Sequence, residues 1–518
     1  MRHVVTIFVL AALQAACSGG AGTPPAQGAA QPAQAAATAT AGAPQAAADG
    51  DDAPPAYEAA LPVELRVLLQ QTYTGDFDGM VKRRVIRAGV PFNRTYYFID
   101  EGQQRGLAYE YLMLFEEALN KKLNTGLLKV HVVPMPLPRD QLLSALQAGK
   151  VDLVAAQLTI TPERQAIVDF TAPSRRGVNE IVVTGPESPA INSVDELAGK
   201  RVHVRKTSSY YQSLQALNQR FAKEGKTPVD INEASDYLED DDLLEMVNAG
   251  LIDAVVVDDY LAKFWGKIFP KLQLHENVQL RSGADIAGAV RKKSPKFLAE
   301  INAFVAANGF DSAIGRILNN RYLSNTKYVT NARSEASRRK FEQMAAIFKK
   351  YGDQYDFDYL MMAAQGYQES RLDHNARSHV GAIGVMQVMP ATGAEQKVGD
   401  IKQLEPNIHA GVKYMRFMRD QYFKDEPMSD LNKALFTFAS YNAGPGRIRG
   451  LRREAAKRGL DPNVWFGNVE HIASERIGRE TVTYVANIYK YYLAYSLVVQ
   501  ENARRKAAKT AITSGGSR

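Results

Sequence analysis

The fold of this chain is decided by the stretch Gly149-Lys-Val-Asp-Leu-Val-Ala-Ala-Gln-Leu-Thr-Ile-Thr-Pro-Glu-Arg164 and by what surrounds it. Within this stretch, residues 151–155 form a short apolar run that predicts a strand, and residues 140–148 predict a helix before it. Strands that alternate with helices are typical of α/β proteins with largely parallel sheets. The stretch therefore predicts an α/β domain.

The same alternation extends to both sides of this stretch. Strands are expected at residues 84–90, 130–133, 201–204 and 254–257, and helices at residues 106–123, from Ser209 and from Tyr260. After about Asn325 the strand signals vanish, and helical patterns dominate residues 337–500. A length of 518 residues is too great for one ordinary domain. We therefore expect a multidomain protein, with an α/β domain followed by a mostly α domain.

The α/β region, residues 83–325, resembles the periplasmic solute-binding family that serves amino-acid importers. The resemblance is carried by residues 149–164 and by Val168-Asp-Phe-Thr-Ala-Pro173. It implies two α/β lobes that close on a ligand. One lobe would be formed by residues 83–182 plus 278–325, and the other by residues 183–277.

The resemblance also implies ligand-binding roles in both lobes. Arg164, with Thr159 beside it, would pair with a ligand carboxylate, because a guanidinium makes two parallel charge-assisted hydrogen bonds. Ser208 falls where the family places a helix N-terminus that donates backbone N–H groups to an anion. Asp258 falls where an aspartate meets the amine of the ligand. An amino-acid-like ligand or a muropeptide is therefore expected.

Two positions of this domain depart from the family pattern. Thr207 and Gln157 stand where glycine is usual, so the pocket could have changed its ligand or lost it. Two other interpretations also stay open. The arginine could form a surface ion pair with Glu163 or Asp169, and the aspartate could be an acidic strand end without a ligand.

The helical region carries four short motifs, and its resemblance to a known family depends on their order and spacing. The motifs are Gln368-Glu-Ser-Arg371, Gly381-Ala-Ile-Gly-Val-Met-Gln387, Ser440-Tyr-Asn-Ala-Gly444 and Glu480-Thr-Val-Thr-Tyr-Val485. Together they resemble the goose-type lysozyme and lytic transglycosylase family over residues 337–497. The resemblance implies a lysozyme-like, mostly α domain that cleaves peptidoglycan glycan strands.

Glu369 is the candidate catalytic residue. It lies near the end of an expected helix, at the edge of an apolar stripe that includes Phe357, Leu360 and Met361. Asp356 is a candidate N-cap of this helix. Partial desolvation raises the pKa of a carboxyl group, so that it holds a proton near neutral pH and can deliver it to a glycosidic oxygen.

A second carboxylate is usual in glycosidases, and Asp373 is the obvious candidate. However, residues 372–376 look like a helix exit and a turn, where an aspartate accepts backbone hydrogen bonds. The family resemblance likewise implies one glutamate. We expect Glu369 to protonate the glycosidic oxygen and then to deprotonate the muramic C6 hydroxyl. That second step closes a 1,6-anhydro ring without consuming water.

Six further motif residues have substrate-binding roles by resemblance: Ser370, Met386, Gln387, Tyr441, Asn442 and Tyr484. The serine and glutamine would hydrogen-bond sugar or acetamido groups, and the methionine would pack beside the cleaved linkage. Tyr441 and the asparagine would hold Glu369 or the sugar, and Tyr484 would orient Glu369. Core packing is the competing interpretation for these side chains. The eight histidines show no metal-ligand cluster in the sequence, so no metal and no cofactor are expected.

The N-terminal residues predict export. Residues 1–17 join a basic start to a short apolar run, which is the pattern of a secretory signal too short to span a membrane. Leu13-Gln-Ala-Ala-Cys17 resembles an imperfect lipobox, so Cys17 is a candidate lipidation site, with an ordinary signal peptide as the alternative. Ser18 resembles the sorting pattern for the outer membrane. Residues 18–55 are almost entirely Ala, Pro, Gly, Gln and Thr and predict a flexible tether.

The net charge of +7 is unevenly spread: residues 331–518 carry about +9 and include an expected basic tail at residues 498–518, and the rest of the chain is slightly acidic. A basic surface favours any polyanion. An exported protein rarely meets nucleic acid, whereas the cell wall is anionic, so nucleic acid is not an expected partner. A solvated basic surface without a partner is the alternative.

These patterns predict a lipid-anchored lytic transglycosylase on the periplasmic side of the bacterial outer membrane. Its N-terminal domain would sense or position a ligand. Two alternatives stay open. One is a hydrolytic muramidase that uses Asp373 to activate water, and the other is a non-catalytic lipoprotein that binds the cell wall or a solute.

Overall fold

The strands between residues 85 and 291 form two sheets. The computed structural model describes residues 71–100, 102–332 and 335–515, so the expected signal, the tether and Cys17 lie outside the described residues. The strands are β1 (Val85–Val90), β2 (Phe98–Asp100), β3 (Gln103–Arg105), β4 (His131–Pro136), β5 (Leu153–Thr159), β6 (Val168–Phe170), β7 (Arg175–Thr184), β8 (Arg201–Arg205), β9 (Asp230–Ala234), β10 (Ala254–Asp258) and β11 (Gln273–Arg291). The larger sheet has the order β4-β1-β5-β11-β7-β10-β8-β9, with β6 beside β11, and β2 pairs with β3.

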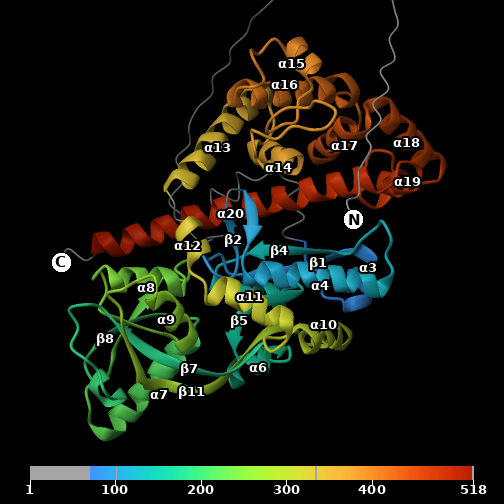
Figure 1. Ribbon diagram of the computed structural model, residues 1–518. Helices are drawn as coiled ribbons and strands as arrows, with labels where there is room; N and C mark the ends of the chain where they lie inside the picture. Colours follow the sequence, from blue (N-terminus) through green and yellow to red (C-terminus); the bar gives the residue numbers. More distant parts are fainter. Residues whose placement is uncertain (1–70, 101, 333–334, 516–518) are drawn as a thin grey trace, which may run out of the picture. The chain divides into compact units, whose positions relative to one another are not determined.

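The larger sheet contains two parallel groups joined by antiparallel strands (Figure 1). In one group β1 pairs in parallel with β4 and β5, and in the other β8 pairs in parallel with β9 and β10. β7 and β11 run antiparallel to each other and to their neighbours between the groups. The α/β alternation expected from the sequence is confirmed, and the expected lobe boundaries fall in these two joining strands.

Helices accompany both groups of strands. They are α3 (Phe77–Arg83), α4 (Leu107–Leu123), α5 (Arg139–Gln147), α6 (Pro162–Ile167), the 3-10 helix η1 (Val194–Leu197), α7 (Ser209–Glu224), α8 (Asp240–Asn248), α9 (Asp259–Gly266), α10 (Pro295–Asn308) and α11 (Ala313–Leu323). In α4 the expected apolar side is buried at Leu107, Leu112, Phe115 and Leu119, whereas Tyr111 is half-buried. These positions recur at helical spacing, which explains why this segment packs as an amphipathic helix.

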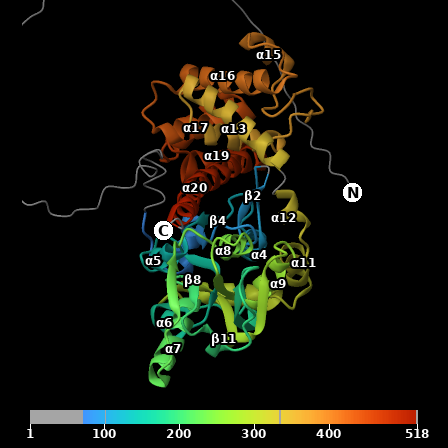
Figure 2. The same ribbon diagram turned by 90° about the vertical axis from the view of Figure 1, so that its left-hand side faces the viewer.

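The rest of the described chain is helical. Its elements are α12 (Lys327–Ala332), α13 (Glu335–Tyr355), α14 (Tyr359–Ser370), α15 (Pro390–Gln396), α16 (Leu404–Phe423), α17 (Asp430–Ala443), α18 (Pro445–Lys457), the π-helix η2 (Trp465–Val469), α19 (Glu470–Arg476) and α20 (Arg479–Gly515). Helix α14 packs against both α13 and α20. Helix α16 packs against both α13 and α17 (Figure 2). Trp465, Phe436 and Phe438 are fully buried in the core of this bundle. The mostly α fold is therefore confirmed.

Two details of the helical region differ from the sequence-based expectation. Asp356 is not the N-cap of α14, because the side chain of Asp358 accepts the cap hydrogen bond from the backbone N–H of Leu360. Asp356 instead adopts a left-handed conformation with φ of 55° before the helix. Residues 498–515 are not a separate tail, because α20 continues through them. Among the described residues, no helix is long and apolar enough to cross a membrane.

A buried ion cluster ties β1, β5 and β11 together. Asp152, which is fully buried, accepts a hydrogen bond from the backbone N–H of Arg87 at 2.9 Å and ion-pairs with its side chain at 3.3 Å. Arg291 lies 3.5 Å from the same carboxylate, and Arg83 also contacts it. The carboxylate therefore neutralises guanidinium groups that are themselves largely out of water.

We expect Asp152→Ala to lower the free energy of unfolding of this domain by about 3–5 kcal/mol, because it leaves buried guanidinium groups without a counter-charge. Urea unfolding of the full chain followed by circular dichroism measures the change. Asp195→Ala is the matched control, since Asp195 also contacts two cations but is exposed to solvent. Equal effects of the two substitutions would contradict the prediction.

Candidate functional site

Glu369 lies in the last turn of α14. The helix ends one residue later because Arg371 adopts a left-handed conformation, with φ of 57°. Met362 and Ala364 are fully buried on the same helix, and Glu369 itself is half-buried. The helix thus holds the carboxyl group at the edge of its buried side, as the sequence pattern predicts.

Tyr484 reaches Glu369 from α20. Its hydroxyl group donates a hydrogen bond of 2.5 Å to Oε1 of Glu369. Nε2 of Gln365, one turn before Glu369 on α14, donates to the Tyr484 hydroxyl at 3.4 Å. Tyr484 is buried and Gln365 is fully buried. The two helices therefore hold a chain of three polar side chains with the carboxyl group at one end.

Burial controls the proton affinity of this carboxyl group. Desolvation raises the pKa of Glu369 to about 7, and the hydrogen bond from Tyr484 offsets part of that increase. Near neutral pH the group is present in both its acid and its carboxylate form. It can therefore donate a proton and take one back without a large energetic penalty in either direction.

The loop of the second motif is held beside the end of α14 by a buried asparagine on α16. Asn407 is fully buried, and its amide donates to the carbonyl of Ile383 and accepts from the backbone N–H of Met386. Gly384, with φ of 75°, approaches so closely that an added Cβ would lie 2.7 Å from the Asn407 amide nitrogen. Only glycine fits this position, which explains the glycine in the motif.

Three of the predicted substrate-binding side chains donate hydrogen bonds to backbone carbonyl groups of the second motif. Ser370 donates to the carbonyl of Val385 at 2.9 Å, and Tyr441 donates to the carbonyl of Met386 at 2.8 Å. The Gln387 amide donates to the carbonyl of Gly384 at 2.8 Å. These bonds bring three of the four motifs together around α14.

The remaining polar motif residue is also engaged within the domain. Asn442 accepts a hydrogen bond of 2.6 Å from the hydroxyl group of Thr481. This bond links the third motif, on α17, to the fourth, on α20. Contacts of the motif side chains with a sugar stay predictions, while their contacts within the protein support the position of Glu369.

Asp373 belongs to the turn that follows α14. Its side chain accepts a hydrogen bond of 2.9 Å from the backbone N–H of Asn375, and its backbone carbonyl accepts from Ala376. The residue is exposed. The turn expected from the sequence is present, and this carboxylate is occupied with the backbone of its own loop.

Sequence reasoning missed two residues of this site. Gln365 lies four residues before Glu369 in an otherwise apolar stretch. A polar residue at that position, one helical turn from the glutamate, could have marked it as part of the site. Asn407 lies in α16, far from every motif in sequence. Nothing local could have identified its role, because it acts through a loop twenty residues away.

In the α/β domain, the predicted ligand residues line one cavity of about 290 Å³. Arg164 is buried at 9% exposure, and its guanidinium donates to the carbonyls of Thr159 at 2.9 Å and Thr207 at 3.0 Å. Among the described residues it has no ion-pair partner, so the alternative of a surface ion pair is wrong. Asp169 instead pairs with Lys292.

Two buried ionisable side chains that have no ion-pair partner among the described residues face this cavity. The pKa of Arg164 is lowered to about 10 by burial and by the nearby Arg139. The pKa of Asp258 is raised well above its usual value by burial and by Asp240 and Glu180, and its Oδ1 lacks a hydrogen-bond partner within the described chain. Burying an ionised group without a counter-charge costs free energy. An anion beside the arginine and a cation beside the aspartate would remove that cost at both residues.

The other two predicted ligand residues already have protein partners. Ser208 caps α7 by accepting from the backbone N–H of Tyr211 at 3.2 Å, and it donates to the carbonyl of Arg205 at 2.6 Å. Thr159 accepts a hydrogen bond of 3.1 Å from the hydroxyl group of Ser209. Both residues line the cavity, but their side chains serve the local structure. In the part of the chain that the structure describes, no group of three acidic, histidine or cysteine side chains could hold a metal.

Two family models match this chain. The model of bacterial extracellular solute-binding proteins, family 3, matches residues 86–324, and the transglycosylase SLT domain matches residues 346–463. The chain is also similar to two proteins named membrane-bound lytic murein transglycosylase F. The one from Desulfosudis oleivorans is 30% identical over 68% of this chain and 79% of that protein. The one from Pseudomonas fluorescens is 28% identical over 82% of this chain and 86% of that protein.

A solved structure of an ancestral arginine-binding protein bound to arginine is 27% identical. It covers 46% of this chain and 98% of that chain, with a TM-score of 0.38.

We expect Tyr484→Phe to raise the pKa of Glu369 above its value of about 7, because the hydrogen bond that favours the carboxylate is lost. The acid form would then persist to higher pH. A ¹³C NMR titration of the glutamate side chains in the full chain measures the shift. Tyr489→Phe on the same helix is the control, since Tyr489 packs against Phe466 instead. An unchanged or lowered pKa in the Tyr484 variant would show that the hydrogen bond has no such role.

Proposed function

The chain belongs to the membrane-bound lytic murein transglycosylase F family and is a peptidoglycan lytic transglycosylase, and we propose that Glu369 is its single catalytic acid and base. The observation that carries this proposal is the half-buried carboxyl group with a pKa of about 7, held by a hydrogen bond of 2.5 Å from Tyr484. A group that titrates near neutral pH can serve first as the acid and then as the base of the same reaction.

The proposed reaction has two proton transfers at the linkage between N-acetylmuramic acid and N-acetylglucosamine. In its acid form Glu369 protonates the glycosidic oxygen, and the C1–O bond breaks through an oxocarbenium-like state. The resulting carboxylate then takes the proton from the C6 hydroxyl of the muramic residue, and O6 forms a bond to C1. The product ends in a 1,6-anhydro ring, and the glutamate regains its proton.

The comparisons favour this reaction over hydrolysis, because they match the transglycosylase SLT domain and relatives named lytic murein transglycosylase F. Asp373 is the residue that a hydrolytic enzyme would use to activate water, and it lies exposed in the turn after α14. The hydrolytic muramidase is the less favoured alternative, and the non-catalytic lipoprotein is not favoured either.

We expect Glu369→Gln to reduce the release of fragments from purified sacculi by at least about 1,000-fold, because the amide neither donates nor accepts a catalytic proton. Asp373→Asn, the matched control, should keep the activity within about threefold, because the amide oxygen can still accept the turn hydrogen bond. Mass spectrometry of the fragments measures how fast they are released and which chemical end they carry.

Fragments with 1,6-anhydro ends are expected, and these are lighter by one water than fragments with reducing ends. The opposite pattern, with reducing ends that disappear in the Asp373 variant, would establish the hydrolytic alternative.

For the α/β domain we propose that the cavity of about 290 Å³ binds a zwitterionic, amino-acid-like ligand or a wall-derived peptide. Arg164 would bind its carboxylate and Asp258 its ammonium group. Support comes from the two buried charges that lack ion partners among the described residues. Such a ligand would supply both counter-charges, and the domain would sense or position it beside a wall-cutting enzyme.

We expect Arg164→Gln to weaken binding of a muramyl dipeptide or of free amino acids at least about 100-fold, because it removes a charge-assisted hydrogen-bond donor. Isothermal titration calorimetry with the full chain measures this affinity. Arg176→Gln is the matched control, because Arg176 is exposed and pairs only with Asp285 among the described residues. Equal affinities in the two variants would place any binding elsewhere.

We also propose that Cys17 carries a lipid anchor and that the protein works on the periplasmic side of the outer membrane. The support for this proposal is the signal pattern of residues 1–17 and the tether composition of residues 18–55.

A further inference from the structure

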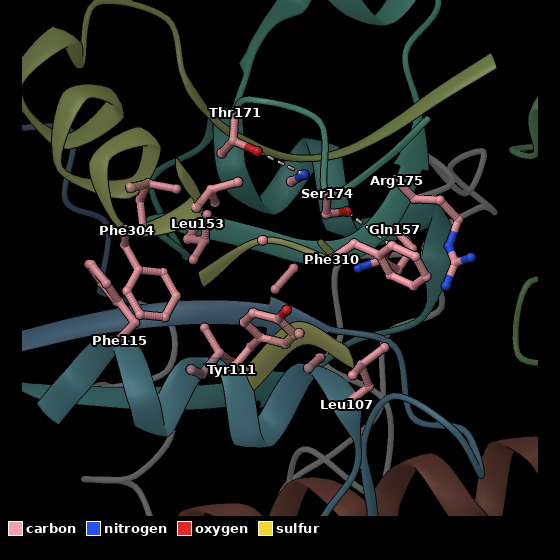
Figure 3. A pocket seen from close by; sticks show the side chains of 18 of the residues that line it. Leu107, Tyr111, Phe115, Leu153, Gln157, Thr171, Ser174, Arg175, Phe304 and Phe310 are labelled. Atoms are coloured by element: carbon pink, nitrogen blue, oxygen red, sulfur yellow. Dashed lines mark hydrogen bonds between the residues drawn. The ribbon is translucent and has the colours of Figure 1, made fainter. Parts of the chain in front are cut away.

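The α/β domain contains a second cavity, of about 120 Å³, between α4, the sheet, α10 and α11 (Figure 3). It shares one lining residue, Gln157, with the cavity of about 290 Å³ that holds Arg164 and Asp258. No motif of the sequence pointed to this second cavity, and the proposed function does not use it.

Most of the wall of this cavity is apolar. Its apolar lining includes Leu107, Leu112, Phe115, Leu153, Ile301 and Phe304. The ring of Phe304 lies edge-on to Phe115, with 5.3 Å between centroids, and to Tyr111, with 6.4 Å. Enclosed apolar cavities of about this size admit small apolar molecules such as benzene, and this one is partly open to solvent. The volume therefore fits one ring or a short alkyl chain.

Small residues keep this space open. Ala108 on α4, Ala155 on β5 and Gly288 on β11 line the cavity. A void of this volume lowers the stability of a protein, because the lining atoms lose packing contacts. An apolar ligand would restore those contacts.

Polar side chains gather at one end of the cavity, and most of them already bind one another. Ser174 donates to Oε1 of Gln157 at 3.2 Å, and Thr171 accepts from the backbone N–H of Gly288 at 3.1 Å. These groups do not require a ligand. Figure 3 shows Arg175 and Phe310 at this end, opposite Phe115 and Phe304.

Arg175 is the charged group of this polar end. Its guanidinium lies between two rings, 4.1 Å from the centroid of Tyr260 and 4.3 Å from that of Phe310. One of its nitrogens donates to Oδ1 of Asn319 at 2.7 Å. Within the described residues no carboxylate lies close enough to form an ion pair with it. The guanidinium has five N–H donors, so several of them remain for an anion.

We propose that this cavity is a second ligand site, which takes a small monocarboxylate with its apolar body between α4 and α10 and its carboxylate on Arg175. A short-chain fatty acid or a simple aromatic acid has this chemistry. The apolar wall binds the body by removing it from water, and the guanidinium fork binds the carboxylate through charge-assisted hydrogen bonds. The site is distinct from the proposed catalytic site around Glu369, and it adjoins the cavity that holds Arg164 at Gln157.

Titration of the full chain with hexanoate and with hexan-1-ol tests the proposal by calorimetry. Hexanoate should bind with a stoichiometry of one, and more tightly than the alcohol. Arg175→Met keeps a long apolar side chain between the two rings but removes the charge, and it should weaken hexanoate binding at least about tenfold while leaving hexan-1-ol within about twofold. Arg176→Met, the matched control at the exposed neighbouring position, should change neither affinity.

Two further variants locate the bound molecule. Val305→Phe adds a ring to the cavity wall and should remove binding of both probes, whereas Ile317→Phe on exposed α11 surface should not. Arg164→Gln should leave hexanoate binding unchanged. Failure of hexanoate to bind, equal affinity in the Arg175 variant, or loss of binding in the Arg164 variant would each overturn the proposal. Circular dichroism confirms that each variant is folded.

Discussion

The chemistry proposed for this protein depends on one carboxyl group that is kept partly out of water while a single neutral hydroxyl group holds it. Desolvation moves the pKa of Glu369 to about 7, and Tyr484 restrains that shift with a short hydrogen bond. A neutral donor suits this task, because a lysine or arginine in its place would favour the carboxylate strongly and remove the acid form at neutral pH. The half-buried position at the end of α14 supplies the desolvation and leaves the carboxyl group at the protein surface for a substrate.

The rest of the catalytic domain keeps this arrangement in place. Tyr484 lies beside Glu369 because α20 packs against α14, and Gln365 donates a hydrogen bond to its hydroxyl group. The loop that carries Gly384 and Met386 is bonded to Asn407, and Ser370 links that loop to the last turn of α14, which carries Glu369. Motif residues that look like ligands for a sugar thus also hold the backbone around Glu369. A change in any of them would move the carboxyl group as well as alter contacts with a substrate.

The α/β domain has a different electrostatic character, because three of its ionisable side chains line cavities and have no ion-pair partner among the described residues. Arg164 and Asp258 face one cavity, and Arg175 stands at the polar end of another. Burying an unpaired charge is costly, so such groups are retained where a ligand supplies the counter-charge. Asp152 in the same domain differs from them, because it is surrounded by guanidinium groups and forms a structural ion cluster, whereas ligand binding is proposed for the other three residues.

The sequence by itself determined the two kinds of domain and the family of each, because strand and helix periodicities and motif spacing are local properties of the chain. It also singled out Glu369 as the candidate catalytic residue, and the structure places that residue at the end of α14. It also predicted the turn at Asp373, since that turn involves neighbouring residues only. It misplaced the helix cap at Asp356, where two nearby aspartates compete and only the backbone conformation decides between them. Only the tertiary structure revealed the roles of Gln365 and Asn407 and the presence of the cavity beside Arg175. Each depends on groups that lie far apart in sequence, and packing between elements is what brings them within contact distance.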